Sequence, residues 1–162
     1  MTTSLQTLCV NSSEATSLFA ERLGACLRPG DTLLLEGDIG AGKTHFARSL
    51  IQSLQDTPED VPSPTFTLIQ TYITRVGEIW HADLYRLNGP DEIFETGLYD
   101  AMEDAICLIE WPDRLASDRP EDALTIEFTT GSAADTRNIT MSSAQADKWV
   151  NKLETCFADH QT

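Results

Sequence analysis

The sequence predicts an α/β fold with three layers, in which helices cover both faces of a mainly parallel central sheet with added antiparallel strands. Two continuous apolar segments, residues 32–36 and 106–109, are typical of buried parallel strands. Apolar residues at helical spacing follow the first segment, over residues 43–54. Two candidate hairpins, residues 66–84 and 124–141, supply the antiparallel strands.

The N-terminal part predicts a short strand over residues 5–10 and then a helix. Asn11 and Glu14 have the spacing of a capping box, and the apolar residues after them recur at helical intervals as far as Leu27. The residues Pro-Gly that follow predict the end of this helix. The strand over residues 32–36 comes next.

The middle of the chain begins with a loop, because residues 56–65 contain three prolines, which exclude a helix. Residues 66–73 and 78–84 predict two strands that are joined near Gly77 and pair antiparallel. A helix is expected around residues 91–98.

The C-terminal part predicts a buried strand, a last hairpin formed by residues 124–128 and 138–141, and a closing helix. An apolar stripe indicates that helix: Ala146, Trp149, Val150, Leu153 and Phe157. The 162 residues contain no repeat and no interdomain linker, so we expect one domain over residues 1–162.

Charge restricts the possible partners. The formal net charge is −15, and the 11 basic residues are scattered, so we expect this chain to bind RNA or DNA poorly by itself. The acidic run over residues 91–122 is either a solvated surface or a docking face for a basic partner. The N-terminal segment lacks the features of a signal peptide or a membrane span, which predicts a cytoplasmic protein without a membrane partner.

The four cysteines never form C-x-x-C, so neither a zinc site nor a redox pair is expected. We interpret all four as buried thiols in a reducing compartment: Cys9, Cys26, Cys107 and Cys156.

The segment GDIGAGKT meets the pattern G-x-x-x-x-G-K-[ST] in full. Its glycines let successive backbone N–H groups point at phosphates, and the N-terminus of the following helix adds partial positive charge. We expect Lys43 to reach the β- and γ-phosphates and the Thr44 hydroxyl to ligate Mg²⁺. A strand before this segment and a helix after it predict a P-loop NTPase-like fold. The predicted nucleotide-binding residues are Gly37, Asp38, Ile39, Gly40, Ala41, Gly42, Lys43 and Thr44.

Three later segments carry groups suited to phosphoryl transfer. Glu110 follows the buried strand in ICLIEW, where a carboxylate can hold the metal, although an ordinary strand end would look the same. Asp83 in HADLYR either orients the attacking water or forms a salt bridge with Arg86. In PSPTF, Thr65 lies on a rigid loop that either senses the γ-phosphate or is a plain connector.

In this order, GDIGAGKT, SPTF, HADLYR and ICLIEW resemble the TsaE family, also called YjeE, over about residues 11–141. The resemblance implies a catalytic set of Lys43, Asp83 and Thr65, with Asp83 needed for hydrolysis and Thr65 in a switch loop. It further implies Mg²⁺ binding by Thr44 and Glu110, and it places Arg137, in TRNITM, near the nucleotide.

The TsaE family is the small ATPase of bacterial tRNA threonylcarbamoyladenosine (t6A) synthesis. The resemblance implies that this chain binds ATP and Mg²⁺ and drives a complex of two other proteins, TsaB and TsaD, which modify an adenosine of tRNA. The chain itself would contact tRNA only indirectly, in agreement with its acidic charge. Its turnover alone should be slow, since no clear arginine finger is visible in the sequence.

Three other classes of protein share the phosphate-binding segment. A GTPase needs N-K-x-D, whereas residues 151–154 read N-K-L-E on the predicted last helix. A small-molecule kinase would use Asp83 to deprotonate an acceptor hydroxyl, but only Arg114 and Arg119 are available for its Arg-rich lid. A nucleotide-binding adaptor would show no turnover even with its partners.

Overall fold

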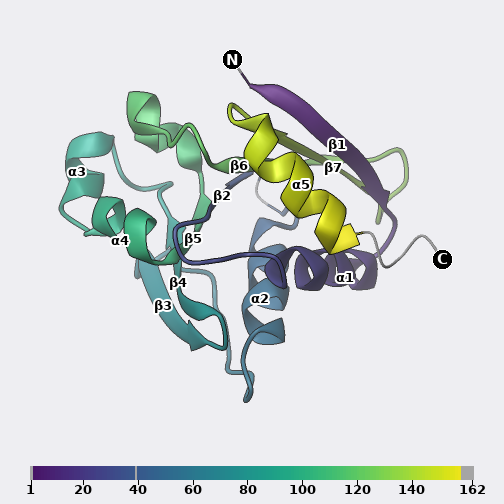
Figure 1. The fold of residues 1–162 in the computed structure, drawn as a ribbon, viewed down its shortest axis with the longest axis horizontal. Coiled ribbons are helices and arrows are strands. Elements are labelled where there is room, and N and C mark those ends of the chain that lie inside the picture. Colours follow the sequence, from purple (N-terminus) through teal and green to yellow (C-terminus); the bar gives the residue numbers. More distant parts are fainter. Residues whose placement is uncertain (1, 39, 158–162) are drawn as a thin grey trace.

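The computed structural model describes residues 2–38 and 40–157, and seven strands of this part form one mixed sheet (Figure 1). The strand order is β1-β7-β6-β2-β5-β4-β3. The strands are β1 (Thr3–Val10), β2 (Thr32–Glu36), β3 (Ile69–Thr74), β4 (Gly77–Asp83), β5 (Ile106–Glu110), β6 (Leu124–Thr130) and β7 (Arg137–Ser143).

The four central strands are parallel, because β2 pairs with both β5 and β6 and β5 pairs with β4. Antiparallel strands extend the sheet at both sides: β3 on β4, β7 on β6, and β1 on β7. Both predicted hairpins are therefore confirmed. Three of the six strand pairings in the described part are antiparallel, so the prediction of a mainly parallel sheet holds for its centre only.

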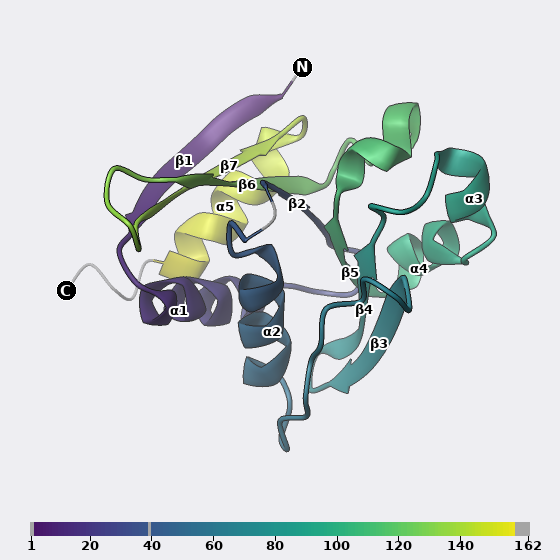
Figure 2. The same ribbon diagram turned by 180° about the vertical axis from the view of Figure 1, so that it is seen from behind.

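Helices cover both faces of the sheet (Figures 1 and 2). One core joins the sheet to α1 (Ser13–Gly24), α2 (Lys43–Ser53) and α5 (Ala146–Phe157). A second core joins the opposite face to α3 (Pro90–Phe94), α4 (Leu98–Asp104) and the 3-10 helix η1 (Pro112–Asp118). None of the helices in the described residues combines the length and apolar character needed to cross a bilayer.

Strand β5 shows how the sequence produces these layers. Ile106 and Leu108 pack into the core under α1 and α2, whereas Cys107 and Ile109 pack into the core under α3 and α4. Successive side chains of a strand point to opposite faces, so a continuous apolar run buries both. The predicted three-layer arrangement is confirmed.

Helix α1 begins one residue later than the predicted capping box implies. The N-cap is Ser12, whose Oγ accepts a hydrogen bond from the backbone N–H of Ala15 at 3.1 Å, so the prediction that Asn11 caps the helix is wrong. Ser12 has the extended backbone that an N-cap requires. The helix ends at Gly24, before the proline and glycine that were expected to stop it.

Two other elements differ from the sequence-based expectation. The predicted helix over residues 91–98 is two short helices, α3 and α4, because Gly97 has a φ of +85° and interrupts it. Strand β3 begins only at Ile69, since the backbone N–H of Leu68 donates to Pro64 O at 2.8 Å and closes a turn.

The cysteine prediction is largely wrong. Cys26 and Cys156 are joined by a disulfide, with Cα atoms 5.9 Å apart, and Cys9 is exposed. Cys107 alone of the four is a buried free thiol, and burial first, then the nearby Glu78 carboxylate, raises its pKa to about 12. A separation of 130 residues conceals the Cys26–Cys156 pairing from any local pattern.

Candidate phosphate-binding cleft

The turn between β2 and α2 requires glycine at two positions. Gly37 has a φ of +143°, and a Cβ there would lie 2.7 Å from the carbonyl oxygen of Phe128. Gly42 is the N-cap of α2 with a φ of +112°, and no side chain caps the helix. The first N–H groups of α2 thus lack a side-chain acceptor, which suits them to bind an anion. Ile39, one of the predicted nucleotide-binding residues, lies outside the described residues.

Lys43 is the first residue of α2 and is only 5% exposed. Its Nζ donates a hydrogen bond to Gly37 O at 2.5 Å and lies 3.7 Å from the centroid of the Trp111 ring. Burial lowers the pKa of Lys43, and the carboxylates of Glu110 and Asp83 act in the opposite direction. The ammonium group is therefore fixed beside two acids, although water cannot solvate it freely.

Thr44 and Glu110 bring two oxygen donors together. The Thr44 hydroxyl donates to the carboxylate of Glu110, at 3.1 Å from Oε1 and 3.2 Å from Oε2. Thr44 comes from the first turn of α2, and Glu110 is the last residue of β5 and is buried. These are the hard oxygen ligands that Mg²⁺ prefers.

Asp83 lies next to Glu110, because the two residues occupy the same register position of the parallel strands β4 and β5. Its Oδ2 accepts a hydrogen bond from the Thr65 hydroxyl at 3.4 Å, and its Oδ1 accepts one from the backbone N–H of Tyr85 at 3.0 Å. In the described residues, Asp83 forms no salt bridge with Arg86, which was the alternative for this carboxylate. The Arg86 guanidinium instead lies 4.4 Å from the ring centroid of the exposed Phe66.

These side chains line one cavity of about 340 Å³, which we call the phosphate cleft. Its lining residues are Gly40, Gly42, Lys43, Thr44, His45, Ser63, Thr65, Asp83, Glu110 and Trp111. The structure thus brings together the residues predicted to act in catalysis and in metal binding. Predicted residues Gly37 and Asp38 instead border a separate hollow beside β6.

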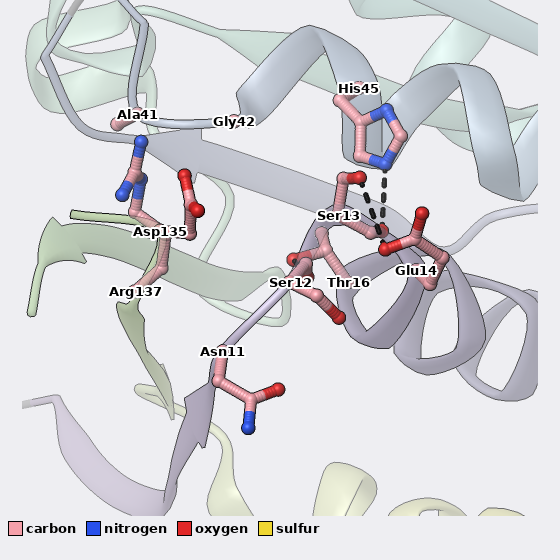
Figure 3. Close-up of a pocket in the computed structure, with 10 residues that line it drawn as sticks. All are labelled: Asn11, Ser12, Ser13, Glu14, Thr16, Ala41, Gly42, His45, Asp135 and Arg137. Atoms are coloured by element: carbon pink, nitrogen blue, oxygen red, sulfur yellow. Dashed lines mark hydrogen bonds between the residues drawn. The ribbon is translucent and has the colours of Figure 1, made fainter. Parts of the chain in front are cut away.

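A second cavity of about 340 Å³, which we call the α1 cavity, adjoins the phosphate cleft (Figure 3). Gly42 and His45 line both cavities. Arg137, predicted to lie near the nucleotide, is in the α1 cavity and not in the phosphate cleft. In Figure 3 its side chain lies close to Ala41 and beside Asp135, across from the N-terminus of α1. The α1 cavity is lined by Asn11, Ser12, Ser13, Glu14, Thr16, Ala41, Gly42, His45, Asp135 and Arg137.

Sequence reasoning missed two histidines near these cavities. His45 Nε2 lies 3.0 Å from Ser13 O and 2.9 Å from Ser17 Oγ, which joins α2 to α1. His81 is fully buried, with Nε2 2.7 Å from Glu110 Oε2. A signal for His81 was present, because it precedes Asp83 by two positions and strand alternation places both side chains on one face.

The sequence also matches a known family. A family model described as "Threonylcarbamoyl adenosine biosynthesis protein TsaE" matches residues 10–139. The chain belongs to the TsaE family. Proteins of this family are tRNA t6A biosynthesis proteins.

Individual TsaE relatives support this assignment. The TsaE protein of Rickettsia bellii is 45% identical over 104 residues, which cover 64% of this chain and 72% of the relative. That of Bacillus subtilis is 37% identical over 131 residues, 80% of either chain. Both are named "tRNA threonylcarbamoyladenosine biosynthesis protein TsaE". A solved structure, "Crystal structure of Bacillus subtilus YdiB", superposes with a TM-score of 0.76 at 29% identity and covers 100% of this chain and 99% of its own.

Proposed function

We propose that this chain is a Mg²⁺-dependent ATPase with a P-loop NTPase-like fold that drives tRNA t6A modification. The observation that carries the proposal is the convergence of Lys43, Thr44, Asp83 and Glu110 on one cavity at the N-terminus of α2. A cation, a hydroxyl and two carboxylates around unpaired helix N–H groups are the components that phosphoryl transfer uses.

The two adjoining cavities suit the two ends of ATP. The β- and γ-phosphates would occupy the phosphate cleft, with the Lys43 ammonium beside them. The α1 cavity, which shares Gly42 with the cleft, would hold the adenosine, with Arg137 at its wall. The hydroxyl and amide groups of residues 11–13 line that cavity and supply donors and acceptors for a base or ribose.

The donor set fits Mg²⁺. The described residues hold no group of three or more His, Cys, Asp or Glu side chains that would bind a metal unaided. Mg²⁺ commonly uses one or two carboxylates together with substrate phosphates, so Thr44 and Glu110 suffice to hold it. Bound there, it would neutralise charge that develops on the phosphates.

The remaining residues act on the attacking water. Asp83 would accept a hydrogen bond from that water and orient it toward the γ-phosphate, as positioning catalysis requires. The Thr65 hydroxyl, which donates to Asp83, couples the SPTF loop to this carboxylate.

Turnover by the chain alone should be slow, because no arginine is among the described residues that line the phosphate cleft. The two arginines that could belong to a lid are engaged elsewhere. Arg114 donates to the carbonyl oxygen of Tyr85 at 3.2 Å, and Arg119 forms an ion pair with Glu36 at 2.6 Å. The same engagement disfavours the alternative, a small-molecule kinase, which closes an Arg-rich lid over its phosphates. A cation supplied by a partner would raise the rate.

The proposed partners are TsaB and TsaD, in the cytoplasm. A chain with a net charge of −15 is suited to dock on a basic protein surface and would meet tRNA only through that complex.

The test is a reconstitution. ATP hydrolysis by the chain is measured alone and with TsaB, TsaD and tRNA, and t6A is quantified by mass spectrometry of digested tRNA. We expect phosphate release to rise on addition of the complex and repeated modification cycles to require ATP. Lys43→Ala serves as the control that lacks the phosphate-binding ammonium.

Two results would overturn the proposal. One is t6A formation over many cycles that is equal with and without this chain. The other is transfer of the γ-phosphate to a small-molecule acceptor instead of water, which would establish the kinase.

A further inference from the structure

His81 lies against the carboxylate of Glu110, the proposed metal ligand. His81 Nε2 lies 2.7 Å from Glu110 Oε2, and both side chains are buried, with exposed fractions of 0% and 4%. The same Oε2 also accepts from the Thr44 hydroxyl at 3.2 Å. Glu110 is therefore held from two sides, by α2 and by β4.

The imidazole is costly at this position. Its Nδ1 is buried and has no hydrogen-bond partner among the described residues. A buried polar atom without a partner destabilises a fold. The neighbouring positions on the same face, Ile79 on β4 and Leu108 on β5, are filled by apolar side chains instead. Packing alone would favour an aliphatic residue here. The contact between Nε2 and Glu110 accounts for a histidine at this position.

Strand geometry explains why β4 can supply this contact. His81 and Asp83 lie two positions apart and so point to the same face of the sheet, toward α2. Asp83 pairs in register with Glu110, and His81 pairs with Leu108, two positions before Glu110, which brings the imidazole within reach of the same carboxylate. Strand β4 thus carries both Asp83, the proposed water-orienting acid, and His81, which contacts the neighbouring Glu110.

We propose that His81 is a positioning residue that, by donating from Nε2–H to Glu110 Oε2, holds the carboxylate so that Oε1 faces the metal position beside Thr44. Oε1 lies 3.1 Å from the Thr44 hydroxyl, whereas the hydrogen bond of His81 goes to the other oxygen, Oε2. A carboxylate free to rotate would need to be ordered when the metal binds, which weakens affinity. Hydrogen bonds from outside the ligand set typically contribute 10–100-fold to metal affinity. This inference rests on the proposed function, since it concerns the same metal site.

The test measures metal binding without turnover. Mn²⁺, which replaces Mg²⁺ and is detected by electron paramagnetic resonance, is titrated into the ADP-bound protein. For His81→Leu we expect Mn²⁺ affinity to fall about 10–100-fold, whereas ADP affinity in EDTA stays unchanged. For His81→Gln, whose terminal amide reaches the position of Nε2, we expect most of the affinity to return. Ile79→Ala, which opens the core on the same strand, should lower the melting temperature but not Mn²⁺ affinity.

His81→Asn makes the test independent of the leucine variant. Its shorter amide mimics Nδ1 rather than Nε2, so Asn should lose Mn²⁺ affinity where Gln retains it, even if His81→Leu does not fold. Equal Mn²⁺ affinity of the wild type and of either His81→Leu or His81→Asn would overturn the positioning role and leave the proposed function intact. No metal-dependent nucleotide binding by the wild type would overturn both.

Discussion

Asp83 and Glu110 occupy matching positions of neighbouring strands but have different partners. Glu110 contacts the Thr44 hydroxyl of α2, and both residues line the phosphate cleft. Asp83 instead contacts the Thr65 hydroxyl, which belongs to a loop. Glu110, hydrogen-bonded to α2, is suited to bind a metal. Asp83, hydrogen-bonded to the loop of Thr65, is suited to orient a water. Changes at these residues should therefore separate binding from hydrolysis.

The first prediction concerns the charge of Asp83. Asp83→Asn keeps the shape of the side chain and its acceptor oxygen but loses the carboxylate, so ATP hydrolysis should fall about 10²–10⁴-fold. Nucleotide affinity, measured by calorimetry, should change little, because the proposed phosphate contacts are with α2 and Lys43. Lys43→Ala should abolish nucleotide binding instead.

The control for Asp83→Asn is Glu95→Gln, which removes an exposed carboxylate outside both cavities and should leave both measurements unchanged. Hydrolysis by Asp83→Asn at the wild-type rate would show that another group orients the water.

Site residues that occupy a defined position in a sequence motif could be predicted, whereas roles that depend on contacts with other elements of the fold could not. Thr44 and Glu110 could be placed at one site because a glycine-rich turn precedes Thr44 and a buried apolar strand ends at Glu110. Strand alternation places His81 on the face of Asp83, but its contact with Glu110 depends on which strand lies beside β5, and no local pattern states the order of strands. The depth of Lys43 under Trp111 likewise becomes visible only in the fold.

At the scale of elements, the turn from β2 into α2 depends on β6. The carbonyl oxygen of Phe128 on β6 approaches the turn so closely that a Cβ on Gly37 would lie 2.7 Å away. This contact fixes where the glycine turn begins relative to the sheet. A side chain at position 37 must therefore shift either the turn or β6.

The second prediction follows from this contact. Gly37→Ala combines a clash with backbone and a φ of +143°, so it should lower the free energy of unfolding by about 1–3 kcal/mol. It should also weaken ATP binding, since the turn carries the N–H groups that we propose to bind phosphate. Urea denaturation and calorimetry measure the two effects.

A second glycine provides the matched control. Gly89 has a φ of 170°, which is extended backbone, and a Cβ there meets nothing within 4 Å. Gly89→Ala should therefore leave both quantities nearly unchanged. If Gly37→Ala behaved like Gly89→Ala, the close approach of β6 would not constrain the turn.

Elements were predictable where one local signal decided them. Continuous apolar runs identified β2 and β5, and Gly77 marked the hairpin between β3 and β4. The start of β3 was missed because Leu68 adopts a φ of +69°, which few leucines do. The break between α3 and α4 was missed because a glycine inside a short helical pattern does not by itself end a helix.

At the scale of the whole molecule, contacts distant in sequence fix the C-terminal helix. The buried Asp31 forms ion pairs with Lys152 at 2.6 Å and Lys148 at 3.2 Å, both on α5. The disulfide between Cys26 and Cys156 joins the same helix to the segment after α1. The amphipathic stripe predicted that α5 is a helix. The place where α5 packs depends on residues more than 100 positions earlier in the sequence, since Asp31 and Lys152 are 121 positions apart.

The last prediction concerns the Cys26–Cys156 disulfide. Closing a loop of 130 residues restricts the unfolded chain, and for a loop of this size the stabilisation is about 3–5 kcal/mol. Reduction should therefore lower the melting temperature measured by calorimetry. Cys156→Ser should have the lower melting temperature with or without reductant, because no disulfide remains to be broken.

Alkylation identifies the thiols involved. Without reductant, iodoacetamide should modify the exposed Cys9, while Cys107, with a pKa of about 12, stays protonated and unreactive near neutral pH. After reduction, Cys26 and Cys156 should become modified as well, and their modification should accompany the loss of stability. Two results would contradict this prediction: reaction of all four cysteines only after denaturation, or a melting temperature that reductant leaves unchanged. The covalent connection between α5 and the segment after α1 would then contribute nothing to stability, and the ion pairs of Asp31 would have to hold the helix alone.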